Sequence, residues 1–244
     1  MKILVVADEN EMSVEASRLI GALVRTKPNA VLGLPTGSTP LGTYRELIRM
    51  CYEENLDFSR IHTINLDEYV GLSGDHPQSY RAFMKNNFFD HINIDQSNTH
   101  VPNGLAENVE EECRRYDDLL RHYGCTDLQL IGIGQNGHIA FNEPADAFTP
   151  ETHLVTLTES TINANQRFFD NREEVPRTAI SMGMRGIMST KHLILIASGE
   201  GKADAVAKSC FGPVTPEVPG SLIQLHPCVT VIVDEAAMSL SGFY

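Results

Sequence analysis

The chain has 244 residues, 42% of them hydrophobic and 21% charged, a composition that is typical of a globular protein and excludes an intrinsically disordered chain. The formal net charge of -13 at pH 7 repels polyanions, so nucleic acid and anionic membrane surfaces are not expected as partners. Five widely spaced cysteines without a C-x-x-C pair indicate neither a disulfide framework nor a structural zinc site, and no apolar run is long enough to span a membrane. We therefore expect a cytoplasmic protein, in which a small anionic ligand needs a local basic pocket.

Short apolar runs alternate along the chain with segments of helical length. Continuous runs of this kind are typical of strands buried on both faces of a parallel sheet, and they occupy residues 2–6, 30–34, 61–66, 127–133, 192–197 and 229–234. Apolar residues three and four positions apart predict amphipathic helices over residues 11–25, 40–54 and 106–124. The alternation predicts a three-layer α/β/α fold with a mostly parallel, Rossmann-like sheet. No repeat or Gly/Ser linker interrupts it, so we expect a single domain over residues 1–244.

The segment PTGSTP, residues 35–40, follows the second predicted strand and precedes a predicted helix. Ligands of parallel α/β sheets bind beyond the carboxyl ends of the strands, and the backbone N–H groups at such a turn can hold a phosphate. The alternative is a plain Ser or Thr cap on the helix. The position at a strand end favours phosphate binding by this loop.

The run GIGQNG, residues 132–137, matches the G-x-G-x-x-G pattern of dinucleotide-binding proteins. That pattern requires a helix directly after the third glycine, and the following HIAFNEP does not resemble a helix start, because Pro144 forces the preceding residue into an extended conformation. The pattern also lies in the middle of the chain. We therefore expect no nucleotide cofactor, and predict that the glycines form a tight turn that directs His138 at a small ligand.

Three residues that follow predicted strands are candidates for proton transfer: Asp67, His138 and Glu143. A histidine beside a carboxylate transfers protons near neutral pH, although such pairs are also common structural features. Asp67 alone would be read as a turn cap. The three together favour chemistry. No H-x-H, H-E-x-x-H or cysteine cluster is present, so no metal site is expected.

Arg167 and Lys202 are the candidate phosphate-binding cations. Lys202 follows a predicted strand within SGEGKADA, which only superficially resembles a Walker A loop, because Ile196 and Ala203 occupy positions that require Gly and Ser or Thr. An ordinary surface position is the alternative for either cation.

The motifs LGLPTGSTP, NLDEYVGL, HPQSY, NFFDHI, IGIGQNGHIAFNEP, NQRFFDN and LIQLHP together resemble the glucosamine-6-phosphate deaminase family, from the first predicted strand to the last. The resemblance implies conversion of glucosamine 6-phosphate and water to fructose 6-phosphate and ammonia, without metal or nucleotide. Two alternatives remain open: a 6-phosphogluconolactonase-like hydrolase, which shares the fold and a glycine-histidine loop, and a non-catalytic sugar-phosphate sensor.

The resemblance also implies a role for each candidate. His138 opens the sugar ring, Glu143 orients it, and Asp67 moves the C2 proton. The 6-phosphate is held by Gly37, Ser38, Thr39, Arg167 and Lys202. Asn136 stands where many members carry Asp, so the site has one carboxylate fewer. Residues that bind an N-acetylated sugar phosphate activator in some members correspond to Asp146, Ala147, His153 and Val155, which predicts hyperbolic kinetics. A monomer or small homo-oligomer is expected.

Overall fold

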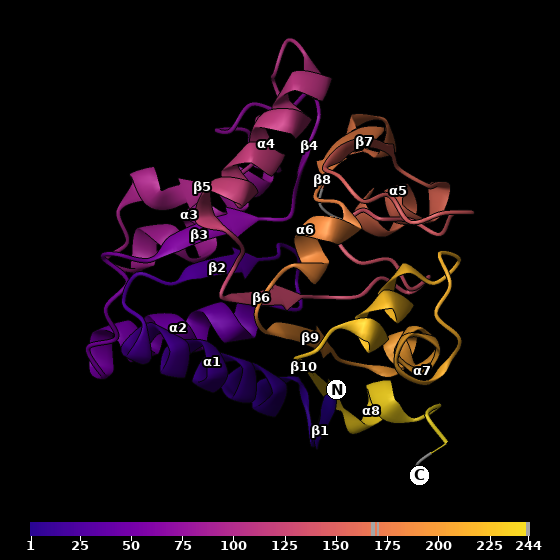
Figure 1. The fold of residues 1–244 in the computed structure, drawn as a ribbon, viewed down its shortest axis with the longest axis horizontal. Helices are drawn as coiled ribbons and strands as arrows, with labels where there is room; N and C mark the ends of the chain where they lie inside the picture. Colours follow the sequence, from indigo (N-terminus) through magenta and orange to yellow (C-terminus); the bar gives the residue numbers. More distant parts are fainter. Residues whose placement is uncertain (167–168, 170, 243–244) are drawn as a thin grey trace.

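A seven-stranded, entirely parallel sheet forms the centre of the computed structural model, which describes residues 1–166, 169 and 171–242 (Figure 1). The strand order is β1-β10-β9-β6-β2-β3-β5. The strands are β1 (Lys2–Val6), β2 (Val31–Leu34), β3 (His62–Asn65), β5 (Thr99–His100), β6 (Leu128–Ile131), β9 (Leu193–Ala197) and β10 (Val229–Asp234). All six predicted strands are confirmed, and the short edge strand β5 adds a seventh.

Helices cover both faces of this sheet, which confirms the three-layer α/β/α prediction. One face carries α1 (Glu9–Thr26), α2 (Leu41–Glu53) and α3 (Tyr80–Asn87), and α1 and α2 lie side by side in Figure 1. The other face carries α4 (Val109–Tyr123), α6 (Met184–Met188), α7 (Ala203–Phe211) and α8 (Glu235–Met238). The three predicted helices correspond to α1, α2 and α4. Short 3-10 turns occupy Phe89–His91, Gln96–Asn98, Arg172–Glu174, Glu200–Lys202 and Pro219–Leu225.

Strand β9 shows why the apolar runs are continuous. Ile194 and Ile196 pack into the cluster under α1 and α2, whereas Leu193 and Leu195 pack into the cluster under α4 and α7. Successive side chains of a strand point to opposite faces, so a strand between two helical layers buries its side chains on both faces. All five residues of β9 are buried.

A second, three-stranded antiparallel sheet lies beside the main one and was not predicted from the sequence. It pairs β4 (Asp67–Tyr69) with β8 (Thr178–Ser181), and β8 with β7 (His153–Thr156). The segment from β7 to β8 includes α5 (Glu159–Asn165), whose Ile162 packs with Tyr69 in a third, small apolar cluster. Asp67 therefore begins a strand of a second sheet instead of capping the end of β3.

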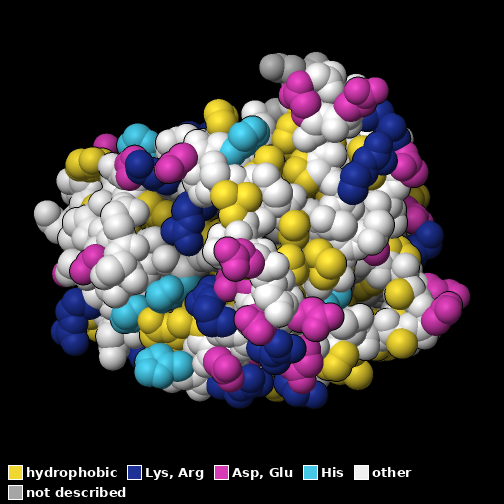
Figure 2. All heavy atoms as spheres, turned by 90° about the horizontal axis from the view of Figure 1, so that it is seen from above, with side chains coloured by type: hydrophobic (Ala, Val, Ile, Leu, Met, Phe, Trp, Pro, Cys, Tyr) yellow, Lys and Arg dark blue, Asp and Glu magenta, His cyan; other side chains and the backbone are white. Residues whose placement is uncertain are grey.

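Charged side chains of both signs lie on the surface of the described chain (Figure 2). On the face shown in Figure 2, Lys and Arg side chains lie among Asp and Glu side chains, so basic residues do not dominate this face as they do in nucleic-acid-binding proteins. Among the described residues, no helix has the length and apolar character needed to cross a membrane.

Candidate active site

A cavity of about 600 Å³ lies at the carboxyl ends of four neighbouring strands, β9, β6, β2 and β3. It is lined by the loop that follows each strand, which is the arrangement expected of a ligand site in a parallel α/β sheet. Seven of the predicted site residues line it: Gly37, Ser38, Thr39, Asp67, Asn136, His138 and Lys202. Glu143 lies behind His138, outside the lining of the cavity. Arg167 lies outside the described residues.

Hydrogen bonds from two buried side chains hold the start of the PTGSTP loop and the residue before it. The Tyr44 hydroxyl donates to the Pro35 carbonyl oxygen at 2.5 Å, and the Asn65 amide donates to the Leu34 carbonyl oxygen at 2.8 Å. Gly37 has a φ of 97°, which favours glycine at this turn. The N-cap of α2 is Pro40, which makes no side-chain hydrogen bond, so the helix begins without the Ser or Thr N-cap of the alternative interpretation. The loop leads into α2 and faces the cavity, as phosphate binding requires.

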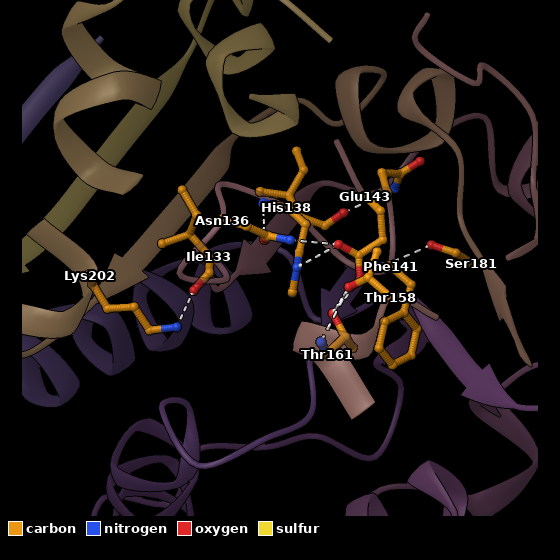
Figure 3. Close-up of polar contacts among 11 residues, drawn as sticks. Ile133, Asn136, His138, Phe141, Glu143, Thr158, Thr161, Ser181 and Lys202 are labelled. Atoms are coloured by element: carbon orange, nitrogen blue, oxygen red, sulfur yellow. Dashed lines mark hydrogen bonds and ion pairs between the residues drawn. The ribbon is translucent and has the colours of Figure 1, made fainter. Parts of the chain in front are cut away.

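Lys202 reaches the cavity from the turn after β9. Its ammonium group donates to the Ile133 carbonyl oxygen at 2.6 Å, as Figure 3 shows. The contact holds the lysine against the loop that follows β6, and both Lys202 and the PTGSTP loop line the cavity.

The glycines of GIGQNG build a turn around His138, as predicted. Gly137 donates from its backbone N–H to the Gly134 carbonyl oxygen at 3.0 Å, and Gly134 donates to the His138 carbonyl oxygen at 2.9 Å. A Cβ atom at Gly134 would lie 2.3 Å from Cε1 of the His138 ring. Turns rather than a helix follow the last glycine, as predicted, so the helix that the dinucleotide fingerprint requires is not formed at residues 138–144.

Glu143 contacts the loop of residues 132–138, which carries Asn136 and His138, through one carboxylate oxygen. Its Oε2 lies 3.4 Å from Nδ1 of His138 and accepts a hydrogen bond of 2.8 Å from the Asn136 amide (Figure 3). The Glu143 side chain is only 10% exposed. Burial acts to raise its pKa, but the hydrogen bond and charge of His138, with bonds from Thr161 and Asn136, lower the pKa to about 2. Glu143 is therefore an anion that can orient the imidazole and stabilise its protonated form.

Asp67 has the opposite electrostatic environment. It is 7% exposed, and burial, with a smaller contribution from the neighbouring Glu68 carboxylate, raises its pKa to about 8. Its strand pairs with β8, where Ser181 lies opposite it. A carboxyl group whose pKa lies near neutrality is suited to accepting and returning a proton during a reaction.

Several residues of the cavity were missed by the sequence analysis. Thr161, Asn165 and Phe169 line it from α5 and the segment beyond, and Tyr80 lines it from the start of α3. The one local sequence signal for this part of the cavity was the helix cap Thr158. Its side chain accepts a hydrogen bond from the backbone N–H of Thr161 at the start of α5. A polar T-E-S-T run of this kind does not by itself indicate a site.

Comparison of the sequence and of the fold with known proteins found similar proteins over almost the whole chain. Residues 9–232 match the family described as glucosamine-6-phosphate isomerases/6-phosphogluconolactonase. A glucosamine-6-phosphate deaminase from Thermoanaerobacter pseudethanolicus is 53% identical, covering 98% of this chain and 95% of that protein. The solved structure of a monomeric glucosamine-6-phosphate deaminase is 48% identical, covering 98% of this chain and 100% of that one, with a TM-score of 0.96. A 6-phosphogluconolactonase from Thermotoga maritima shares the fold at 18% identity, with coverage of 96% and 99% and a TM-score of 0.74.

Proposed function

The chain belongs to the family of glucosamine-6-phosphate isomerases and 6-phosphogluconolactonases, and we propose that it is an enzyme that converts glucosamine 6-phosphate and water to fructose 6-phosphate and ammonia. The observation that carries this proposal is that one cavity contains Asp67 and His138 together with the PTGSTP loop and Lys202. Such a cavity can hold a sugar by its phosphate while two proton-transfer groups face its other end. Relatives named for this activity share about half of their residues with almost the whole chain, which supports it.

The phosphate group of the substrate binds at Gly37, Ser38 and Thr39, with Lys202 as its cation. Backbone N–H groups at the start of α2 and the lysine ammonium supply donors and positive charge. Arg167 is proposed as a second cation from the sequence resemblance alone. Because the phosphate takes no part in bond breaking, its binding energy serves to align the sugar with the proton-transfer groups.

Ring opening is assigned to His138. The imidazole accepts the proton of the C1 hydroxyl and passes a proton to the ring oxygen as the bond between C1 and that oxygen breaks, which gives the open-chain aldehyde. Glu143 does not line the cavity, so its role is to hold the imidazole and stabilise its charged form. Asn136 fixes the Glu143 carboxylate by the bond that it donates.

Isomerisation and deamination are assigned to Asp67. Its carboxylate removes the C2 proton to give an enolamine, and the proton is returned to C1, which leaves an imine at C2. Water adds to this imine and ammonia leaves, so that the ketose forms and the atoms balance. The positively charged amino group of the substrate favours the ionised form of Asp67, which offsets the effect of burial on its pKa.

The overall change is hydrolysis of a carbon–nitrogen bond, and we propose that it proceeds without a metal ion. The proton transfers are served by Asp67 and His138, and no step requires a Lewis acid. Turnover that is unchanged in an excess of a metal chelator is the expected result, and activity restored only by an added divalent cation would contradict it.

A 6-phosphogluconolactonase-like hydrolase is the second candidate, since that activity also carries the family's name and fold. Lactone hydrolysis needs a water molecule activated beside the sugar carbonyl, a task that His138 can perform. It does not need a second, buried proton carrier such as Asp67, and the identity to the lactonase structure is far lower than to the deaminase structure. A non-catalytic sensor would not need the proton-transfer groups Asp67 and His138.

The experiment that tests the function measures ammonia and fructose 6-phosphate release from glucosamine 6-phosphate by the purified chain and by Asp67→Asn and His138→Gln. Equal release of both products, lost in both variants while their circular dichroism is unchanged, is expected. Hydrolysis of 6-phosphogluconolactone instead would assign the second candidate, and binding of the sugar phosphate without turnover of either compound would assign a sensor.

We further propose that residues 1–244 act as one domain, as a monomer or small homo-oligomer, in the cytoplasm. The solved deaminase structure with a TM-score of 0.96 is monomeric, which supports the first alternative. All five cysteines are free thiols, as is usual in reducing compartments. Light scattering of the purified chain measures the mass directly.

A further inference from the structure

The two carboxylate oxygens of Glu143 face different elements of the fold. Oε2 faces the loop that carries His138 and Asn136. Oε1 faces α5, where it accepts a hydrogen bond from the Thr161 hydroxyl and lies 3.3 Å from the Thr158 hydroxyl (Figure 3). The Glu143 carboxylate thus connects the loop of residues 132–138 with α5, which begins more than ten residues later in the sequence.

The backbone of Glu143 does not determine where its carboxylate points. Pro144 and the Asn142 amide, which donates to the Ile139 and Met182 carbonyl oxygens, fix the main chain. The last torsion of a glutamate is broad, so the direction of its two oxygens depends on their partners. Oε2 lies at an ion-pair distance of 3.4 Å from Nδ1 of His138, which has no hydrogen-bond partner among the described residues, so a rotation of the carboxylate would change this contact directly.

Thr161 is placed to prevent this rotation. It is 4% exposed, and its hydroxyl has Oε1 of Glu143 as an acceptor and the Thr158 hydroxyl as a donor at 3.1 Å. Thr158 also caps α5, so the proton of its hydroxyl is directed into the same small network. Thr161 and Asn165, one helical turn apart, both line the substrate cavity.

We propose that Thr161 is a positioning residue, whose hydroxyl holds the Glu143 carboxylate against His138 and so couples the docking of α5 to the ring-opening step. This inference rests on the proposed function and assigns a role within it. It predicts that the hydroxyl of Thr161 affects the rate of the chemical step and not the affinity for the sugar phosphate.

The first test compares Thr161→Val and Thr161→Ser with the wild type, after turnover of glucosamine 6-phosphate by the wild type has been established. Valine keeps the shape of threonine without the hydroxyl, and serine keeps the hydroxyl. We expect a fall in kcat of about 10- to 100-fold for Thr161→Val with KM within about twofold, and recovery of most of the rate in Thr161→Ser. Thr156→Val is the matched control: Thr156 is exposed at the end of β7, and its substitution leaves kcat unchanged.

The second test is a double-mutant cycle with Glu143→Gln. If Thr161 acts through Glu143, the double variant Thr161→Val/Glu143→Gln loses no more activity than Glu143→Gln alone. Additive losses would overturn the proposal, because Thr161 would then act independently of Glu143.

Three other results would also overturn it. They are unchanged kcat in Thr161→Val, a rise in KM without a fall in kcat, and a lower melting temperature as the only effect. Absence of turnover in the wild type would instead contradict the proposed function, so the two failures are distinguishable.

Discussion

Asp67 lies directly opposite Ser181 in the antiparallel pair of β4 and β8, and the Ser181 hydroxyl accepts a 3.1 Å hydrogen bond from the backbone N–H of Phe141. The residue after Ser181, Met182, accepts a further bond from the Asn142 side chain. Through β8, the small sheet therefore joins the strand of the proposed base to the loop of His138. The relative position of the two proton-transfer groups depends on this second sheet as well as on the main one.

Asp67→Asn is expected to abolish turnover and to stabilise the fold at neutral pH. The raised pKa of about 8 means that the folded chain keeps a proton that the unfolded chain loses near its ordinary pKa of 3.8. The free energy of unfolding of the wild type therefore falls as pH rises from about 4 to about 8. That of Asp67→Asn does not fall for this reason, because asparagine does not titrate. Thermal melts should show a melting temperature above that of the wild type, with a gap that widens across this window. Asp118→Asn, on an exposed side chain, is the control, and a constant gap would contradict the raised pKa.

Glu143→Gln is expected to lower kcat by about 100-fold, in the range of general acid–base contributions, while KM changes little. The reason is that Glu143 contacts His138 from outside the cavity and does not line it. Steady-state kinetics at pH 7 measure both constants, and Glu53→Gln, which is exposed on α2, provides the control. A large rise in KM would place Glu143 in contact with the substrate instead.

Lys202→Met is expected to raise KM about 10- to 100-fold, as the loss of a charge-assisted phosphate contact predicts. Inorganic phosphate should inhibit the wild type competitively and the variant much more weakly. The exposed Lys208 on α7, which pairs with Asp204, allows Lys208→Met as a control. Equal inhibition of wild type and Lys202→Met by phosphate would remove Lys202 from the phosphate site. Melting temperatures should be compared as well, because Lys202 also bonds to Ile133.

Rate curves are expected to be hyperbolic and insensitive to N-acetylglucosamine 6-phosphate. A second cavity has a volume of about 220 Å³. It is lined by Ala147, His153 and Val155 among other residues. Within the described chain, neither Lys nor Arg lines it, so a phosphate would find little positive charge there. Initial rates over a range of substrate concentrations, with and without the N-acetyl compound, are the measurement. A sigmoidal curve that the compound converts to a hyperbola would show that the activation exists.

The main sheet and most of the cavity could be predicted because their signals are local. Continuous apolar runs marked the strands, and the unusual residues after each run marked one edge of the sheet. The prediction that no helix follows the third glycine of residues 132–137 was also correct, because Pro144 and the residues before it carry that signal within ten positions.

The second sheet could not be predicted in the same way. Its strands have three or four residues each, and β7 exposes Leu154 while it buries Val155, so no continuous apolar run marks it. The pairs between β4 and β8 join residues more than one hundred positions apart, such as Asp67 and Ser181. The contact of Thr161 with Glu143 is likewise a product of tertiary packing. Local patterns carry no information on such partners.

The strand order of the main sheet also has a consequence for how the chain folds during its synthesis. β1 forms an edge of the sheet, and the strand beside it is β10, with Lys2 in register with Thr230. Within this sheet, the first strand to be synthesised is thus paired with the last. Because chains fold from the N-terminal end as they are made, β1 and one face of α1 remain without their sheet partner until β10 has emerged. We expect nascent chains that end before residue 229 to be bound by chaperones through this exposed apolar segment.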